Sequence, residues 1–134
     1  MDINDICAEI VGSVYSALGC GVVDLSSGLL LGVSHKVPYF TQSYLDIAAA
    51  AAVDMFRGRN VTAVEQMIAN IRGKSENFMI EEIQMTSKNT YHFMAIIPEK
   101  PNAMVVLITN RKTNLGMGWA AVRMALPKLA PLCP

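Results

Sequence analysis

Few side chains in this sequence have the types and spacing that catalysis or metal binding requires. The two histidines, His35 and His92, are far apart and belong to no HExxH motif or other metal-binding pattern. No serine lies in a GxSxG motif, so nothing indicates a nucleophile supported by a histidine and an acid. We therefore expect a protein that is not an enzyme and that has no catalytic residues, no metal and no cofactor.

Two other features could bind a charged partner. Gly116-Met-Gly118, at the start of a predicted helix, resembles a phosphate-binding turn but lacks the third glycine and a following Lys-Ser/Thr. These glycines are better explained by tight packing of the loop and helix on the sheet. The basic residues near the end of the second predicted helix could meet an acidic partner; they are Arg57, Arg59, Arg72 and Lys74.

The cysteines indicate a reducing compartment. Cys7, Cys20 and Cys133 form no CxxC motif, and their odd number leaves one unpaired in any disulfide scheme. We expect reduced thiols in a cytoplasmic protein, with Cys7 and Cys20 packing as small apolar groups. The N-terminus carries Asp2 where a signal peptide has basic residues, so we expect no signal peptide.

Composition predicts one domain, residues 1–134, that shares an interface with another chain. Apolar residues make up 52% of the sequence and charged residues only 16%, an excess that suits a buried contact. Eleven basic residues balance eleven acidic ones, so we expect no nucleic-acid partner. The longest apolar run, 47–53, is much shorter than the ~20 residues of a membrane-spanning helix, so we expect no insertion into a membrane.

Periodicity and turn signals predict an alternating α and β order. We expect helices at 2–18, 42–57, 63–72 and from Leu115, and strands at 20–25, 29–34, 77–86, 90–97 and 103–109. The strand at 103–109 is apolar on both faces, so it should lie in the centre of a sheet that helices cover on both sides. The predicted class is α+β, with a five-stranded sheet between helical layers.

Local signals mark where the helices begin and end. Asp2, Asn114, and either Thr41 or Ser43 are expected N-caps, and 62–65 matches a capping box. Gly19 and Gly73 are expected to follow the ends of the first and third helices, and Pro127 should kink or end the last one.

The helix at 42–57 has more apolar surface than one sheet contact uses. At 100° per residue, one narrow arc can cover the sheet, and it holds Leu45, Ala49, Ala52 and Phe56. A second apolar arc lies to one side and holds Tyr44, Ala48, Ala51 and Met55. The second arc could pack on 63–72 of its own chain. We favour the alternative, in which it contacts a second copy and the two alanines allow the helices to approach closely.

The sequence resembles the roadblock / dynein light chain family in its prokaryotic form. The resemblance rests on GVVDLSSGLLL at 21–31, IAAAAAV at 47–53 and TNLGMGW at 113–119, and the order of elements agrees over nearly all of the chain. It implies a profilin- or longin-like roadblock sandwich with a five-stranded antiparallel sheet. It also implies homodimers in which the second helices pack together and the third strands pair edge to edge. The well-capped segment at 62–72 is longer than the family's usual connection.

The charges of the third strand restrict how it can pair with its symmetry mate. Like charges directly opposite each other destabilise a ladder, so Glu81 and Glu82 should not face each other. A two-fold axis near Ile83 places Glu82 against Gln84 and avoids the clash. The predicted dimer interface therefore comprises Tyr44, Ala48, Ala51, Met55, Glu82, Ile83 and Gln84.

The resemblance also implies a function. Family members are non-catalytic platforms, and the bacterial ones bind or regulate small Ras-like GTPases. We expect a homodimeric scaffold that binds such a GTPase and tunes its state, with Arg57, Arg59 or Arg111 as possible partner-binding residues. The alternative is a small-ligand sensor of profilin- or PAS-like layout, which would need an apolar pocket between the sheet and a helix.

Overall fold

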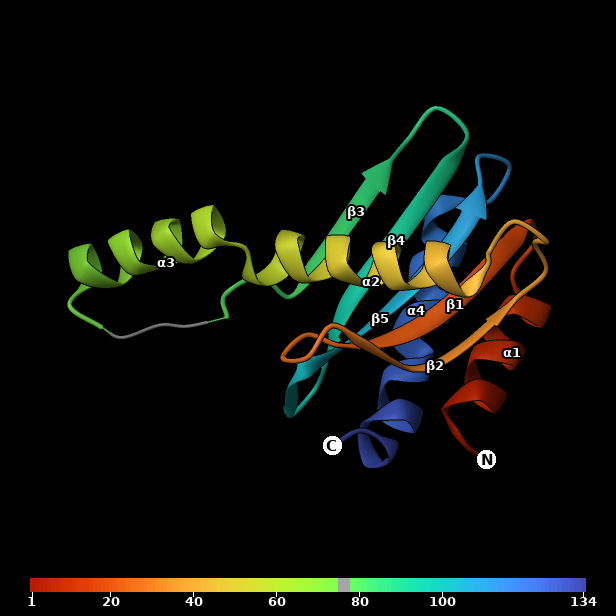
Figure 1. Cartoon of the computed structure of the whole chain (residues 1–134), viewed down its shortest axis with the longest axis horizontal. Coiled ribbons are helices and arrows are strands. Elements are labelled where there is room, and N and C mark those ends of the chain that lie inside the picture. The colour runs from red at the N-terminus through yellow and green to blue at the C-terminus, as the bar shows by residue number, and fades with distance from the viewer. Residues whose placement is uncertain (75–77) are drawn as a thin grey trace.

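The computed structural model describes residues 1–74 and 78–134, which form one antiparallel sheet between helical layers (Figure 1). The strands lie in the order β2-β1-β5-β4-β3, and every neighbouring pair is antiparallel. In chain order the elements are α1 (Ile3–Ser13), β1 (Ala17–Asp24), β2 (Leu29–His35), α2 (Gln42–Arg57), α3 (Arg59–Arg72), β3 (Glu82–Thr86), β4 (Thr90–Ile97), β5 (Lys100–Asn110), α4 (Leu115–Leu129) and the 3-10 turn η1 (Ala130–Leu132).

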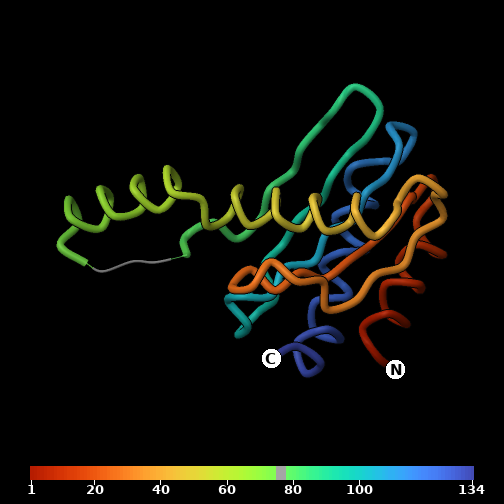
Figure 2. Tube along the Cα trace, viewed as in Figure 1, coloured from red at the N-terminus to blue at the C-terminus, as the bar shows by residue number. Residues whose placement is uncertain are grey.

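β5 lies in the centre of the sheet, as its apolar faces predict. One face packs on α1 and α4 through Val105 and Leu107, and the opposite face packs on α2 through Met104, all fully buried. The Cα trace in Figure 2 shows the same layers, with α2 alone in front of the sheet and α1 and α4 behind it. The predicted α+β class and five-stranded antiparallel sheet are confirmed.

The capping residues define three helix starts as the sequence indicates. Asp2 and Asp5 form a reciprocal capping box at α1. Thr41 accepts the backbone N–H of Tyr44 at the start of α2, so it rather than Ser43 is the cap. Asn114 accepts the N–H of Met117 at the start of α4. The Thr41 cap and strong periodicity account for the agreement of α2 with its predicted bounds, and the turns on either side of β4 account for the agreement of that strand.

The first helix is shorter than the 2–18 that its apolar spacing predicts. α1 ends at Ser13, and the chain enters β1 at Ala17. Gly19 does not stop a helix; it lies inside the strand, where an added Cβ would be only 3.0 Å from the Cβ of His35. The prediction was wrong because Ala17 and Leu18 continue the apolar pattern into an element of a different type.

The third helix begins four residues before the predicted start, and the capping-box interpretation of 62–65 was wrong. α3 begins at Arg59 and has no side-chain cap. The Thr62 hydroxyl donates to the carbonyl of Gly58, 2.9 Å away, one turn earlier. The Glu65 carboxylate is buried and accepts the backbone N–H of Met79 at 2.6 Å. Thr62 therefore stabilises the first turn of the helix, and Glu65 joins the helix to the segment that leads back to the sheet.

β3 is shorter than the predicted strand at 77–86, and α4 is not ended by its proline. Residue 77 lies outside the described residues, and Phe78 has a φ of 59°, which a regular strand does not adopt. The strand begins only at Glu82, although the carbonyl of Glu81 already accepts the N–H of Ile96 at 2.8 Å. Pro127 lies in the last turn of α4, which continues to Leu129.

All three cysteines are buried and free of disulfides. The thiols of Cys7 and Cys20 are hydrogen-bonded to each other, and this bond together with burial raises the pKa of Cys20. No helix within the described residues is both long and apolar enough to cross a bilayer.

Candidate partner-binding surface

α2 presents two apolar faces, as its helical wheel predicts. The first faces the sheet: Ala49, Ala52 and Phe56 are all buried against it. The second face, which we define as Tyr44, Ala48, Ala51 and Met55, is only partly covered. Tyr44 remains 37% exposed and Ala51 is also exposed.

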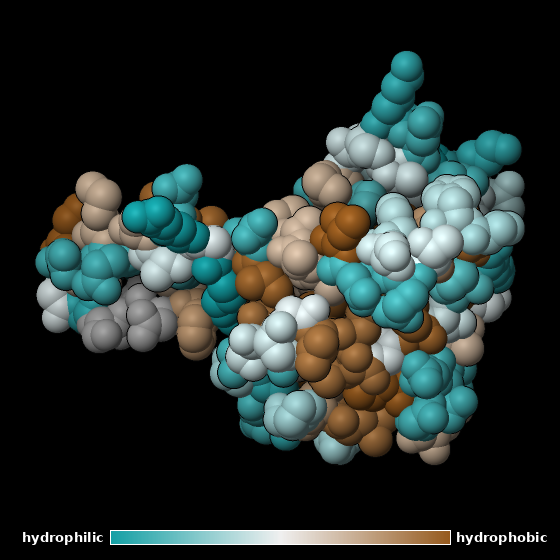
Figure 3. Space-filling view, in the orientation of Figure 1, coloured by the Kyte–Doolittle hydropathy of each residue, from teal (hydrophilic) through white to brown (hydrophobic). Residues whose placement is uncertain are grey.

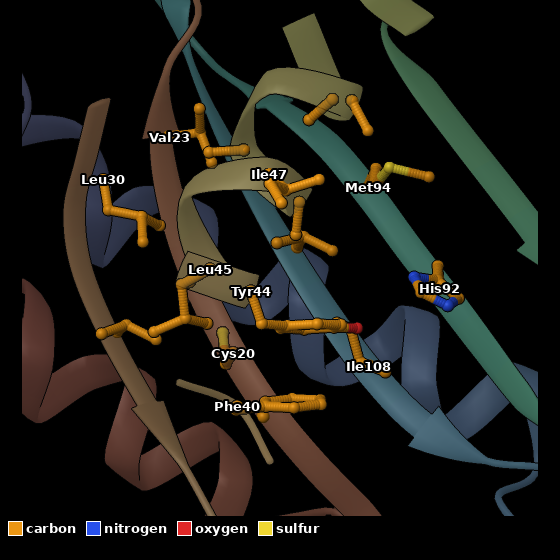
Figure 4. Close-up of a pocket in the computed structure, with 18 of the residues that line it drawn as sticks. Cys20, Val23, Leu30, Phe40, Tyr44, Leu45, Ile47, His92, Met94 and Ile108 are labelled. Carbon is orange, nitrogen blue, oxygen red and sulfur yellow. The ribbon is translucent and has the colours of Figure 1, made fainter. Parts of the chain in front are cut away.

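A cavity of about 300 Å³ separates the second face from the sheet, and we call it the α2 groove. Figure 4 shows its floor, where His92 and Met94 of β4 and Ile108 of β5 lie below the residues of α2. The remaining lining is almost entirely aliphatic or aromatic, and it includes Val23, Leu30, Val33, Phe40, Leu45, Ile47, Met85 and Val106. The α2 groove therefore suits an apolar occupant.

His92 is the floor residue with an ionisable side chain. Its Nε2 lies 2.9 Å from the hydroxyl of Thr90, and burial lowers the pKa of the imidazole below its ordinary 6.5. The neutral form is therefore favoured at pH 7, consistent with an apolar groove. Within the described residues, no group of three or more His, Cys, Asp or Glu side chains is placed to hold a metal ion.

α3 leaves the second face of α2 uncovered. It continues from the C-terminal end of α2 and projects away from the body of the molecule (Figure 1). Tyr44, at the other end of α2, stacks on Phe40 with ring centroids 4.7 Å apart. Packing of α3 on this face within one chain, the first alternative from sequence, is therefore not what the structure shows.

The two edges of the sheet differ in how they are protected. On β2, the outward N–H of Val33 donates to the side-chain oxygen of Asn4 at 2.8 Å, and Ile3 packs so closely that a Cβ on Gly32 would lie 2.4 Å from it. α1 therefore covers that edge. Among residues 1–74 and 78–134, no side chain is hydrogen-bonded to the outward backbone groups of β3, the other edge strand. An uncovered edge of this kind is a template for another strand.

The side chains of β3 divide between the two faces of the sheet. Ile83 packs with the apolar cluster under α2, and Met85 lines the α2 groove. Glu82 faces α4, where its carboxylate accepts two hydrogen bonds from Arg123, at 2.8 and 3.0 Å. This bidentate pair holds the pKa of Glu82 below its ordinary value.

Comparison with solved structures identifies the architecture. A roadblock/LC7 domain from Streptomyces avermitilis superposes with a TM-score of 0.72 at 14% identity, covering 98% of this chain and 97% of the other. MglB of Myxococcus xanthus has a TM-score of 0.69 at 17% identity over 97% and 93% of the chains. MglC from the same organism has a TM-score of 0.61 at 18% identity over 96% and 97%. This chain has a roadblock fold.

The similarity in structure confirms the roadblock resemblance that the sequence motifs indicate. No family model matches the chain, and no curated protein matches it. Another similar structure, of an MglB at 17% identity, is described as a tetrameric arrangement. At sequence identities of 14–18%, similarity to these structures defines only the fold of this chain. Its function must be argued from its own residues.

The three arginines singled out in the sequence occupy different environments on the roadblock fold. Arg57 is held by its own chain: its guanidinium donates to the carbonyl of Pro101 at 2.5 Å and lies 3.9 Å from the ring centre of Phe78. Desolvation lowers the pKa of Arg57, although the charge of Glu65 opposes that effect. Arg59 is exposed at the start of α3, and Arg111 is exposed 5.5 Å from the ring centre of Tyr91.

Of the two glycines at the start of α4, Gly118 has the packing role that the sequence favours. Gly118 is buried, and a Cβ added there would lie 2.4 Å from the ring of Phe93. The absence of a side chain lets α4 lie directly on β4. The packing interpretation is confirmed for Gly118, whereas Gly116 is exposed.

Proposed function

We propose that this chain is a non-catalytic homodimeric scaffold that binds and regulates a small Ras-like GTPase. The observation that carries the dimer is the difference between the sheet edges: Asn4 covers β2, whereas β3 is open beside the uncovered second face of α2. Two copies joined along β3 would form one continuous sheet and bring both α2 helices together. Together with the α2 face, such a contact could reach the 1,200–2,000 Å² typical of stable pairs.

The contacts of β3 support the register with the two-fold axis at Ile83. Directly opposite residues on antiparallel strands share a face, so Glu82 would meet Gln84 on the α4 side. Glu82 already pairs with Arg123, which leaves its charge balanced beside the partner's Gln84. Ile83 would meet its own mate on the α2 side, where it adds to an apolar cluster.

The GTPase partner rests on the resemblance to the bacterial roadblock proteins, and the similarity in fold to MglB and MglC supports the same assignment. The tetrameric arrangement of an MglB supports self-association. Arg59 and Arg111 are the exposed arginines through which we propose contact with the GTPase, whereas the bonds of Arg57 suit an internal clamp. The buried thiols support a cytoplasmic location.

The dimer is tested by charging the second face of α2. We expect Ala48→Glu with Ala51→Glu to give monomers by light scattering, because two carboxylates would be buried against two others across the axis. Ser43→Glu with Ala50→Glu adds the same charge to exposed positions on the polar side of the helix and should leave the dimer intact. An unchanged dimer in the first variant would move the interface to another surface.

The register is tested by cysteine pairing across the axis. Ile83→Cys should form an intermolecular disulfide on mild oxidation, since residues opposite themselves on paired strands lie about 4.5–5.5 Å apart between Cα atoms. Met85→Cys, two residues away on the same face, should not. Efficient pairing at position 85 with none at 83 would show that the axis lies elsewhere.

The GTPase assignment is tested by measuring binding to Ras-like GTPases of the source genome in both nucleotide states, together with their hydrolysis rates. Arg59→Ala and Arg111→Ala should both weaken binding or alter hydrolysis. Arg111→Ala should do so without affecting dimerisation, because Arg111 is exposed in the turn between β5 and α4, away from the proposed interface. Failure to bind in either nucleotide state would count against the assignment while leaving the dimer untouched.

The α2 groove favours a second candidate function, that of an apolar small-ligand sensor. A cavity of about 300 Å³ is at the lower end of known ligand sites, and its lining is almost wholly apolar. Native mass spectrometry of the purified protein distinguishes the two functions. A retained small molecule on a monomer would favour the sensor, and an unliganded dimer would favour the scaffold.

A further inference from the structure

α3 is an arm that stands apart from the rest of the molecule. Figure 3 shows it separated from the body, whose front face around α2 is rich in apolar residues. The arm is fixed at its base: the buried Glu65 accepts the N–H of Met79, and Arg57 lies against the ring of Phe78. These contacts hold the helix in line with α2 and leave its outer side uncovered.

The outer side of the arm carries an apolar stripe. Val64, Met67 and Ile71 recur at spacings of three and four, so they lie on one side of the helix, and they are 56%, 64% and 83% exposed. The half-buried Ile68 borders them. A stripe of this kind on a helix that reaches into solvent is typical of a contact with another chain. We call Val64, Met67 and Ile71 the arm stripe.

The symmetry of the proposed dimer decides where the arm points, and this inference rests on that dimer. A two-fold axis perpendicular to the sheet at β3 reverses every direction that lies in the plane of the sheet. The two α2 helices, which lie across the sheet, must then run antiparallel, and the two arms must extend in opposite directions. Each arm thus leaves its own body and passes along the partner's body.

The point at which the two α2 helices cross determines which residues of the second copy lie beside the arm. If the helices cross midway between Ala48 and Ala51, Met55 of one lies level with Tyr44 of the other. At about 1.5 Å per helical residue, α3 then begins just beyond the N-terminal end of the second copy's α2, beside the connection at 36–41 that precedes it. That connection carries Tyr39, which is 64% exposed.

The connection at 36–41 offers an aromatic surface suited to the arm stripe. Tyr39 meets the ring of Phe40 edge-on at 5.2 Å and that of Tyr44 at 6.4 Å. Phe40 is buried and anchors the group. We propose that the arm stripe of one copy packs against Tyr39 and its neighbours in a second copy, so that the arms embrace the dimer. The contact is continuous with the α2 interface and buries the exposed apolar groups of both partners.

Chemical crosslinking tests this placement. In the variant Tyr39→Cys/Val64→Cys, a short bismaleimide should join two chains, seen as a dimer band under denaturing conditions. The control Tyr39→Cys/Gln66→Cys places the second thiol on the opposite side of α3, so it should give little of that band. The native thiols are buried and should not react. Light scattering of the same samples establishes the oligomeric state independently.

The contribution of the arm stripe to affinity is tested by charge. Val64→Glu with Ile71→Glu should raise the dissociation constant of the dimer at least about tenfold, because two apolar contacts are lost and two charges are introduced. Thr62→Glu with Gln66→Glu adds equal charge at exposed positions on the side of α3 opposite the stripe and should change the constant less than about twofold. Circular dichroism should show equal helix content in both variants.

The possible outcomes distinguish the proposal for the arm from the proposal for the dimer. A dimer with the 39–64 crosslink and a weakened stripe variant supports the proposal. A dimer that forms without the crosslink, or whose affinity is unaffected by the stripe variant, overturns the role of the arm but leaves the scaffold proposal standing. A protein that is monomeric by light scattering overturns both.

Discussion

His92 lies on the floor of the α2 groove, where burial favours its neutral form. Because its pKa in the folded state is below the ordinary 6.5, the unfolded chain binds the proton first as the pH falls. The free energy of unfolding should therefore decrease as the pH falls from 7 through 6.5, and the decrease should stop below the folded-state pKa. Urea denaturation at several pH values would measure this.

The variant His92→Gln provides the control for that titration. It keeps a group that can bond the hydroxyl of Thr90 but removes the ionisable ring, so the slope of stability against pH between 7 and 5 should become smaller. An unchanged slope in the variant would assign the pH dependence to another group.

The Glu82–Arg123 pair gives a second prediction, which concerns a lower pH range than that of His92. The pKa of Glu82 is lowered from 4.5 by the guanidinium, so the pair contributes stability above pH 4.5 and loses it as the pH falls through the folded-state pKa. Because both side chains are largely solvated, Glu82→Gln should lower the melting temperature at pH 7 by only about 3 °C or less. At pH 2 the variant and the native chain should melt alike. The neighbouring Glu81→Gln serves as the control.

At the scale of elements, the contact between α4 and β4 depends on Gly118. Gly118→Ala should cost about 1–3 kcal/mol of stability, since the new methyl group overlaps the ring of Phe93 and forces α4 away. Gly12→Ala is the matched control within a helix: no atom lies within 4 Å of its added Cβ. There the substitution should stabilise the chain by about 0.5–1 kcal/mol. Equal effects at both positions would contradict the packing role of Gly118.

The bounds of an element could be predicted where they are set by residues close together in the sequence, and could not where they are set by tertiary contacts. α2 and β4 have a clear period and flanking caps or turns, and their predicted bounds match the structure. The central position of β5 followed from its apolar residues on both faces. α1 and α3 were misplaced because Gly19 and Thr62 resemble helix boundaries while their roles are set by tertiary contacts.

The features of the candidate surface were predictable only in part. The helical wheel of 42–57 separated the buried face of α2 from the second face correctly, because residues on one helix keep fixed directions. The α2 groove, the clamp formed by Arg57 and the cover that Asn4 gives to β2 join residues far apart in the sequence. No spacing rule reports such contacts. The residues of the dimer interface remain predictions.

At the scale of the whole molecule, association should be visible in thermal unfolding. If only the dimer is fully stable, mass action makes the melting temperature fall when the protein is diluted. Differential scanning fluorimetry over a hundredfold concentration range should show a decrease of several degrees for the native chain. Ala48→Glu with Ala51→Glu should melt at a temperature independent of concentration. A constant melting temperature for the native chain would contradict the dimer.

The side chain of Asn4 also limits how far assembly by strand addition can proceed. With the N–H of Val33 already bonded to it, only one side of the sheet accepts another strand. Pairing on that side joins the β3 strand of one copy to the β3 strand of another, so a dimer has no uncovered β3 edge left. Polymerisation into a fibre would require the β2 side as well. Asn4→Ala would free the N–H of Val33, and together with Ile3→Ala, which uncovers Gly32, it should make the protein prone to filament growth.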